Sequence, residues 1–157
     1  MRGIRADLVV PLDGIDPDAL LESWRWRVPR SSSPLFATAL GDLFLRGGDG
    51  RVCLLDVGDG ELWEVALDLS HFEEMAGDSS NTDLWFARTL VDKLIEAGSI
   101  LRFGECFSYV KSPLIGGLYE SSNFRVYDLL THFRVWGPIH RAISDIPDGT
   151  SIEFAVT

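Results

Sequence analysis

Apolar segments in the middle of the chain predict β-strands, and within residues 61–68 apolar and polar positions alternate. Short turns rich in glycine and aspartate separate these segments. Strands joined by such short turns form an antiparallel meander, and in the third strand Trp63, Val65 and Leu67 share one face. The predicted strands are residues 35–45, with a break near Gly41, residues 51–57 and residues 61–68.

Helical signals precede and follow this meander. Asp16 and Pro17 are typical of a helix start, so a short helix is predicted to continue through Trp24. Ser70 and Glu73 have the spacing of a capping box, which predicts a second short helix beginning there.

A longer helix is predicted over residues 83–97. Thr82 is placed as its N-cap, and apolar residues recur at helical spacing from Leu84 to Leu94. Gly98 follows the last periodic position and is a natural C-terminal stop.

One segment fits two structures. The spacing of the apolar residues within 124–143 fits a helix, whereas their β-branched and aromatic content fits a strand followed by a short helix. We favour a helix that is kinked or restarted at Pro138. Further strands are predicted as an edge strand or arm within residues 1–12, at residues 100–109 with a turn at Gly104, and at residues 151–156.

The length of 157 residues is typical of one domain. We expect a single α+β domain in which an antiparallel meander packs against several α-helices. Within it, an N-terminal strand and helix segment (residues 1–34) precedes the main body (residues 35–157). Hydrophobic residues make up 46% of the chain, which is too many for an intrinsically disordered protein.

The formal net charge of −10 is unevenly distributed. The stretch from Val52 to Ala87 has nine acidic residues and no lysine or arginine, so it alone carries −9. Such a stretch is either a solvated face that keeps the protein soluble or a docking surface for a basic partner. The nine candidate partner-binding residues are Asp56, Asp59, Glu61, Glu64, Asp68, Glu73, Glu74, Asp78 and Asp83.

The acidic composition argues against two classes of partner. A nucleic-acid-binding protein carries a basic face, and an anionic membrane surface repels a protein of this charge. The apolar runs are shorter than a membrane span, and the N-terminus does not resemble a secretory signal. Cys53 and Cys106 form no CxxC pair, so reduced thiols and a cytoplasmic location are expected.

Common catalytic and cofactor-binding motifs are absent from the sequence. Cys106 with His132 or His140 would be a thiol–imidazole pair, but their spacing does not require it, and a buried structural cysteine is favoured. The dispersed histidines and cysteines do not predict a zinc site. We therefore expect a protein that is not an enzyme and has no cofactor.

Two blocks of residues resemble a known protein family. The first runs from Gly41 to Gly58, and the second, more specific block runs from Phe103 to Gly117. With later positions such as His132 and His140, they are similar to the immunity proteins that neutralise type VI secretion DNase effectors. This family was first catalogued as a domain of unknown function beside a GAD-like domain. The motif positions that we interpret as structural are Gly104, Cys106, Pro113, Gly116, Gly117, Gly137 and Gly149.

The resemblance implies a cytoplasmic, non-catalytic protein that blocks the active site or the DNA path of a nuclease toxin. Because a DNase must hold DNA in a basic groove, the resemblance favours a docking role for the nine acids. The alternative is a regulatory or scaffold module of the same fold with an endogenous protein partner. A small enzyme that uses Cys106 or a carboxylate pair is a third hypothesis, and we expect a monomer or a weak homodimer.

Overall fold

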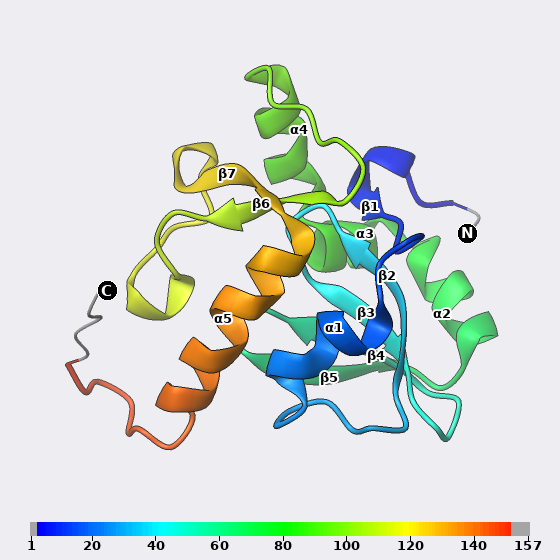
Figure 1. The fold of residues 1–157 in the computed structure, drawn as a ribbon. Coiled ribbons are helices and arrows are strands. Elements are labelled where there is room, and N and C mark those ends of the chain that lie inside the picture. The colour runs from blue at the N-terminus through cyan, green and yellow to red at the C-terminus, as the bar shows by residue number, and fades with distance from the viewer. Residues whose placement is uncertain (1–2, 152–157) are drawn as a thin grey trace.

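A computed structural model describes residues 3–151 and confirms the predicted α+β class (Figure 1). A five-stranded antiparallel sheet has the order β1-β2-β3-β4-β5, and a separate two-stranded sheet pairs β6 with β7. The strands are β1 (Val9–Val10), β2 (Ser33–Thr38), β3 (Leu43–Arg46), β4 (Val52–Asp56), β5 (Glu61–Ala66), β6 (Glu105–Tyr109) and β7 (Phe124–Asp128). The helices are α1 (Pro17–Leu21), α2 (Leu69–Ala76), α3 (Ser79–Phe86), α4 (Arg88–Glu96) and α5 (Leu129–Ile143), with 3-10 turns η1 (Ala6–Leu8), η2 (Glu22–Trp24), η3 (Pro113–Ile115) and η4 (Ser121–Asn123).

The predicted strand over 35–45 is two strands joined by a hairpin turn, so the meander has one more reversal than we expected. Gly41 has a φ of 80°, and its N–H donates to the carbonyl of Thr38 over 2.9 Å. A left-handed backbone angle suits glycine because it has no Cβ to clash. The predicted break near Gly41 is therefore a complete reversal of the chain. Val9 and Val10 form the expected edge strand beside β2.

Each face of the large sheet packs against its own helices. In β3, Phe44 belongs to the cluster that includes Phe72 of α2 and Phe86 of α3, while Leu43 and Leu45 belong to the opposite cluster. That second cluster includes Trp24 and Phe133. Neighbouring residues of a strand point to opposite faces, so a strand covered on both faces is apolar throughout. Figure 1 shows α1 and α5 on the near face of the sheet.

The helix α2 begins one residue before the predicted capping box. Asp68 is the N-cap, and its carboxylate accepts a hydrogen bond from the His71 N–H over 2.8 Å. Ser70 lies inside the first turn instead. His71 is half-buried, and its Nδ1 accepts from the Leu67 N–H over 3.1 Å.

The predicted helix over 83–97 is two helices, α3 and α4. Asp78, not Thr82, caps α3, and its carboxylate accepts from the Ser80 N–H over 2.8 Å. The chain breaks at Ala87, which has a φ of 48° although it is not glycine. The break lets buried residues of both helices reach the same core cluster. This packing overrides the continuous helical spacing that the sequence shows.

The ambiguous segment 124–143 contains a strand and then a helix. Residues 124–128 form β7, which pairs antiparallel with β6, so our preference for helix there was wrong. Asp128 caps α5 by accepting from the Thr131 N–H over 2.9 Å. The helix runs through Pro138 without a restart.

Of the two remaining strand predictions, one is confirmed in part and the other falls almost wholly outside the described residues. Of the strand predicted over 100–109, only Glu105–Tyr109 is β-structure, and Gly104 turns the chain with a φ of 77°. The strand predicted over 151–156 lies outside the described residues from position 152 onward. Within residues 3–151, none of the helices has the length and apolar character to cross a membrane.

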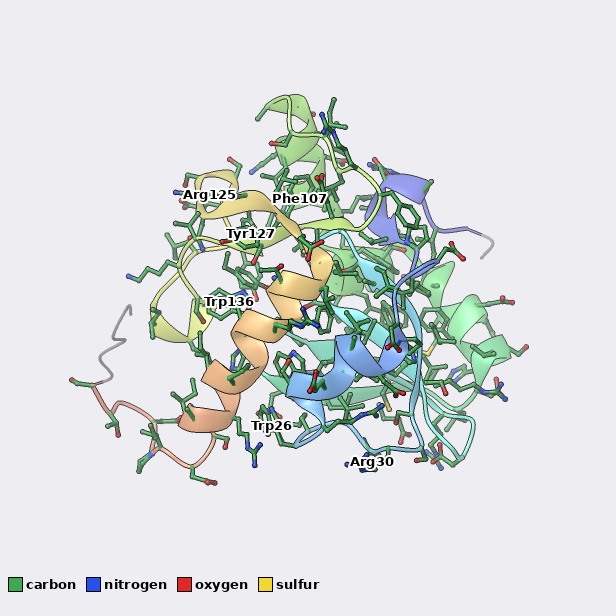
Figure 2. All side chains as sticks on the ribbon, viewed as in Figure 1. Trp26, Arg30, Phe107, Arg125, Tyr127 and Trp136 are labelled. Carbon is green, nitrogen blue, oxygen red and sulfur yellow. The ribbon has the colours of Figure 1, made fainter. Side chains whose placement is uncertain are left out.

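Two buried histidines connect α5 to the turns of the large sheet. His132 Nε2 lies 3.0 Å from the Gly41 carbonyl and therefore donates, which leaves Nδ1 to accept from the Ser108 hydroxyl at 2.6 Å. Trp136, which Figure 2 labels on the same helix, donates its Nε1–H to Ser108 Oγ over 3.2 Å. His140 Nε2 donates to the Val57 carbonyl over 2.7 Å. These contacts hold both sheets to one helix.

We predict that His132 stays neutral until the solution is strongly acidic. Burial lowers its pKa to about 4, below the value of about 6.5 for an unfolded histidine. The unfolded chain therefore binds a proton that the folded state excludes, and this histidine's contribution to stability is complete above about pH 6.5. As pH falls from about 6.5 to about 4, that contribution decreases by about 1.4 kcal/mol per pH unit.

An NMR titration of the His132 imidazole measures this directly. We expect a midpoint near pH 4, or acid unfolding before the ring titrates. A midpoint above pH 6 in the folded protein would contradict the buried, hydrogen-bonded environment.

Candidate interaction surface

The nine acids of the base-free stretch lie along β5 and at both of its ends. Asp56 and Asp59 are at the β4–β5 turn, where Gly60 lies against His140 of α5. Asp68 and the acids of α2 and α3 follow the other end of the strand. A six-residue strand spans about 20 Å, so the structure distributes these acids over a long surface and does not gather them in one cluster.

Three of the nine acids form ion pairs with arginines from outside the stretch. Glu61 lies 3.8 Å from Arg27, Glu64 pairs with Arg51, which precedes β4, and Asp83 lies 3.2 Å from Arg88. All of these pairs are solvent-accessible, so each contributes at most about 1 kcal/mol. They offset three of the nine negative charges.

Three further acids organise the local backbone. Asp68 and Asp78 are the N-caps of α2 and α3, as described above. Asp56 accepts a hydrogen bond from the Asp59 N–H over 3.0 Å and so fixes the β4–β5 turn. Helix capping at Asp68 and Asp78 and turn formation at Asp56 explain why acids stand at these three positions.

The other three acids have no such role in the part of the chain that the structure describes. The side chains of Asp59, Glu73 and Glu74 are exposed and form no hydrogen bond or ion pair there. An exposed unpaired carboxylate contributes to the field around the protein and remains available to a basic partner. These three residues are therefore the strongest candidates among the nine for long-range attraction.

A further carboxylate, Asp42, joins Asp56 near the same end of the sheet, and the sequence analysis did not select it. Its Oδ1 accepts from the Val57 N–H over 2.9 Å. Burial, followed by the charge of Asp56, raises the pKa of Asp42 well above its usual range, and burial likewise raises the pKa of Asp56. Both line a hollow of about 390 Å³ that also contains Asp83, Trp85, Lys93 and Tyr119.

Trp63 is the large apolar side chain that stands out on β5. It is 54% exposed, and Leu67 beyond the end of the strand is 60% exposed. The alternation placed both with Val65, but of the three only Val65 packs against the core. The sequence could not show this, because periodicity gives the face of a strand but not whether the strand lies at the edge of the sheet.

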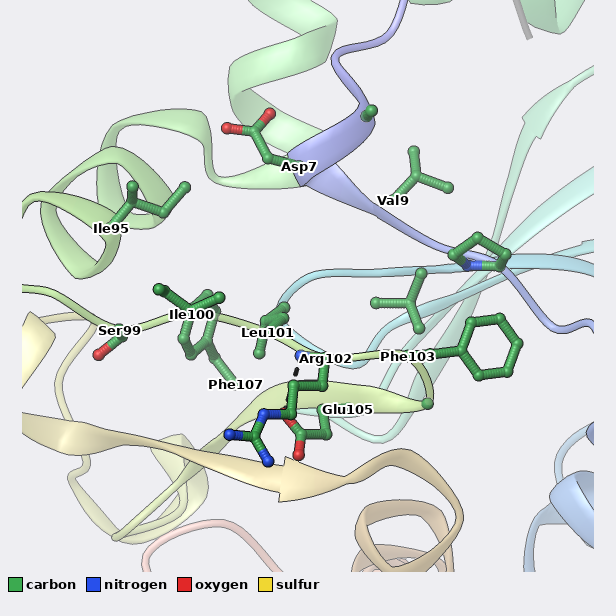
Figure 3. A pocket seen from close by; sticks show the side chains of 14 residues that line it. Asp7, Val9, Ile95, Ser99, Ile100, Leu101, Arg102, Phe103, Glu105 and Phe107 are labelled. Carbon is green, nitrogen blue, oxygen red and sulfur yellow. Dashed lines mark hydrogen bonds between the residues drawn. The ribbon is translucent and has the colours of Figure 1, made fainter.

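A second apolar surface lies beside the other edge of the sheet. A hollow of about 370 Å³ runs between β1 and the segment that follows α4 (Figure 3). Phe103 and Ile100 on its border are 68% and 78% exposed. Exposed apolar groups that cluster in this way are typical of an interaction surface.

The thiol–imidazole pair that we considered is not formed. Cys106 is fully buried, and burial raises the pKa of its thiol far above the usual range, which disfavours the reactive thiolate. Both nitrogens of His132 are engaged by Gly41 and Ser108, and His140 donates to Val57. Among the described residues, no group of three potential ligand side chains could hold a metal ion.

The motif glycines and proline occupy positions with a backbone requirement. Gly104, Gly116 and Gly149 have positive φ angles, and Pro113 begins η3. A Cβ at Gly117 would lie 1.9 Å from the Lys111 carbonyl oxygen, and one at Gly137 would lie 2.5 Å from that of Ser23. Gly117 and Gly137 are therefore sites of close approach, where no side chain fits.

We predict that Asp42→Asn stabilises the folded protein at pH 7. The raised pKa means that the folded state favours the protonated carboxyl, so ionised Asp42 lowers stability, and this penalty disappears as pH falls toward the usual range of aspartate. Asparagine is neutral and keeps an oxygen for the Val57 N–H. Thermal unfolding should show a higher Tm at pH 7 and a smaller gain near pH 4.

The matched control is Asp13→Asn, which changes the same charge at an exposed position and should shift the Tm little. An Asp42→Asn protein that melts below the wild type at pH 7 would refute the assignment. A gain that persists undiminished at pH 4 would also refute it, because protonation should remove the difference.

Comparisons with known proteins find a matching family model and a solved structure of similar fold. Residues 66–140 match the family model described as T6SS immunity protein Tdi1, C-terminal. No curated protein matches the chain. Among solved structures, the chain is similar to Atu4351 from Agrobacterium tumefaciens, with a TM-score of 0.54 and 14% identity.

That similarity covers 78% of this chain and 64% of Atu4351, so this chain spans less than two thirds of the length of the solved structure. At 14% identity it shows a shared fold and no more. The family match begins at the last residue of β5 and ends at His140, so it includes the helices α2–α4, the small sheet and most of α5. Over residues 66–140 the chain is therefore similar to a type VI secretion immunity family.

Proposed function

We propose that this protein is an immunity protein that binds a secreted nuclease effector and neutralises it by covering its active site or its DNA-binding groove. The match of residues 66–140 to a type VI immunity family carries the immunity role. The nuclease identity of the effector rests on the charge of this chain. A surface with nine acids and no base in its own sequence complements the basic groove that DNA requires.

The arrangement of the acids supports binding by electrostatic attraction. Asp59, Glu73 and Glu74 are exposed and unpaired within the described residues, so their fields extend into solvent. An approaching basic protein is attracted before contact, which raises the association rate constant. Fast capture matters for an immunity protein because a free nuclease damages DNA until it is bound.

Inhibition in this proposal is stoichiometric and needs no catalytic group. Immunity proteins are generally non-enzymatic, and the buried Cys106 thiol is poorly suited to nucleophilic chemistry. The protein would act in the cytoplasm, where its two free cysteines stay reduced. Its charge would exclude it from DNA and leave it free for the effector.

Capture from native cells tests the proposal. The tagged chain serves as bait, and mass spectrometry identifies the proteins that are retained in stoichiometric amount. We expect a nuclease effector with a basic catalytic domain. Recovery of housekeeping proteins alone would overturn the proposal and favour a regulatory or scaffold module with an endogenous partner.

We predict that reversing the three unpaired acids slows association with that effector. Asp59→Lys, Glu73→Lys and Glu74→Lys together should lower the association rate constant by about 10- to 100-fold at low salt, with a smaller effect at high salt. These positions lack intramolecular partners in the described chain, so the fold should be retained. Surface plasmon resonance at two ionic strengths measures both effects.

The control changes the same amount of charge elsewhere. Asp13→Lys, Glu22→Lys and Glu96→Lys alter three exposed acids outside the base-free stretch. If this control slows association as much as the test variant, net charge alone governs the rate and the acidic stretch has no special role. Unchanged kinetics in the test variant would likewise contradict the docking role.

A further inference from the structure

The strand β5 is an open edge of the large sheet. It pairs antiparallel with β4 and is the last strand in the sheet order. Six residues long, it is a more extensive template than β1, the opposite edge, which has only two residues. An open strand edge presents backbone N–H and C=O groups that can pair with another strand.

Side chains of this protein bind the backbone at both ends of this edge, and the backbone groups between them have no such partner among the described residues. Before β5, the Gly60 carbonyl accepts from Arg27 Nε over 3.0 Å. After it, the Leu67 N–H donates to His71 Nδ1 over 3.1 Å. Between them, the described residues provide no backbone hydrogen bond to Glu61–Ala66 other than those of the β4 ladder. The outward groups of the middle of β5 are therefore available.

The side chains of β5 specify which kind of strand can pair with it. Trp63 lies at the centre of the strand with 54% of its surface exposed, Glu61 is two residues before it, and Glu64 is the residue after it. A second copy of β5 would bring these carboxylates next to their own kind, which is unfavourable. A segment with lysine or arginine would instead complete charge pairs across the new ladder.

Tryptophan is one of the residue types enriched among interface hot spots. An exposed Trp63 in the middle of an unpaired edge offers an apolar anchor beside backbone groups that need partners. By comparison, the apolar hollow around Phe103 has nothing near it that shows what would cover it. The β5 edge therefore combines three features that a basic, extended segment could use: an unpaired strand, an apolar anchor and negative charge.

We propose that β5 receives an extended basic segment of the effector as an added sixth strand, with Trp63 as the apolar anchor of the contact. This inference rests on the proposed function and identifies the surface that carries it. Backbone pairing supplies affinity in this mode of recognition, and the side chains along the strand supply specificity. Arg27 and Arg51, which pair with Glu61 and Glu64 in the free protein, would be exchanged for basic side chains of the effector.

Two single substitutions test the anchor. Trp63→Ala should raise the Kd for the catalytically inactive effector recovered in the capture experiment by about 30-fold or more. Phe103→Ala, which removes an aromatic ring of greater exposure from the other surface, should change the Kd less than about threefold. Both rings are exposed, so circular dichroism and thermal unfolding should confirm that both variants fold.

Hydrogen exchange tests the added strand itself. Amides within 61–66 should exchange more slowly in the complex than in the free protein, while those of the two-residue strand β1 should not change. If the amides of β5 exchange as fast in the complex as in the free protein, strand addition is wrong. A Trp63→Ala protein that binds as tightly as the wild type, or a larger loss for Phe103→Ala, would overturn the assignment of the surface.

The outcomes separate this inference from the proposed function. If the wild-type chain fails to bind any nuclease effector, the proposed function fails. If the wild type binds and Trp63→Ala binds equally well, only the β5 surface is wrong. Protection of β5 that depends on concentration in the absence of effector would assign the edge to a second copy of this chain and contradict the proposal.

Discussion

Two buried, neutral histidines on α5 connect this helix to the large sheet, and one of them also contacts the small sheet. His132 donates to the Gly41 carbonyl of the β2–β3 turn and accepts from Ser108 of the small sheet. His140, eight residues later, donates to the carbonyl of Val57. His132 requires a defined tautomer, because its Nδ1 can accept from Ser108 only while the ring is uncharged. Because Val57 also donates to Asp42, α5 determines where the carboxylates at this end of the sheet lie.

The apolar cores stabilise the fold, whereas most of the acidic side chains lie on the surface. The cores on both faces of the sheet are apolar and aromatic, and of the nine acids only Asp56 is partly buried. Arginines from other segments offset three of the acids, helix caps and a turn use three, and three remain unpaired within the described chain. The exposed carboxylates can therefore produce a strong field, whereas burial disfavours the charged forms of Asp42 and Asp56. In the proposed complex, that field governs association, whereas Trp63 and the β5 backbone govern how long the complex lasts.

Local chemistry made much of the fold predictable. Alternation and glycine–aspartate turns located β4 and β5, and Asp16 with Pro17 located α1. The failures occurred where tertiary contacts decide. At Ala87 the chain adopts a left-handed angle with no glycine, because two helices share one core. Residues 124–128 became a strand because β6 lies beside them, and no property of the segment alone required that.

The same distinction applies to the candidate site. Composition identified the acidic stretch, but only coordinates show which carboxylates are paired, which cap a helix and which are free. Asp42 and Trp63 were missed for a related reason. The environment of Asp42 arises from the approach of Val57, fifteen residues away, and the exposure of Trp63 arises from the position of β5 at the sheet edge. Both are properties of strand order, which alternation alone does not encode.

The most direct test of the central claim is a titration of nuclease activity. A purified effector at fixed concentration is mixed with increasing amounts of this protein, and cleavage of double-stranded DNA is measured. Stoichiometric neutralisation predicts a linear loss of activity that reaches zero at one equivalent, with no dependence on incubation time. Activity that persists when this protein is in excess, while the two proteins still bind, would contradict occlusion of the active site or the DNA groove.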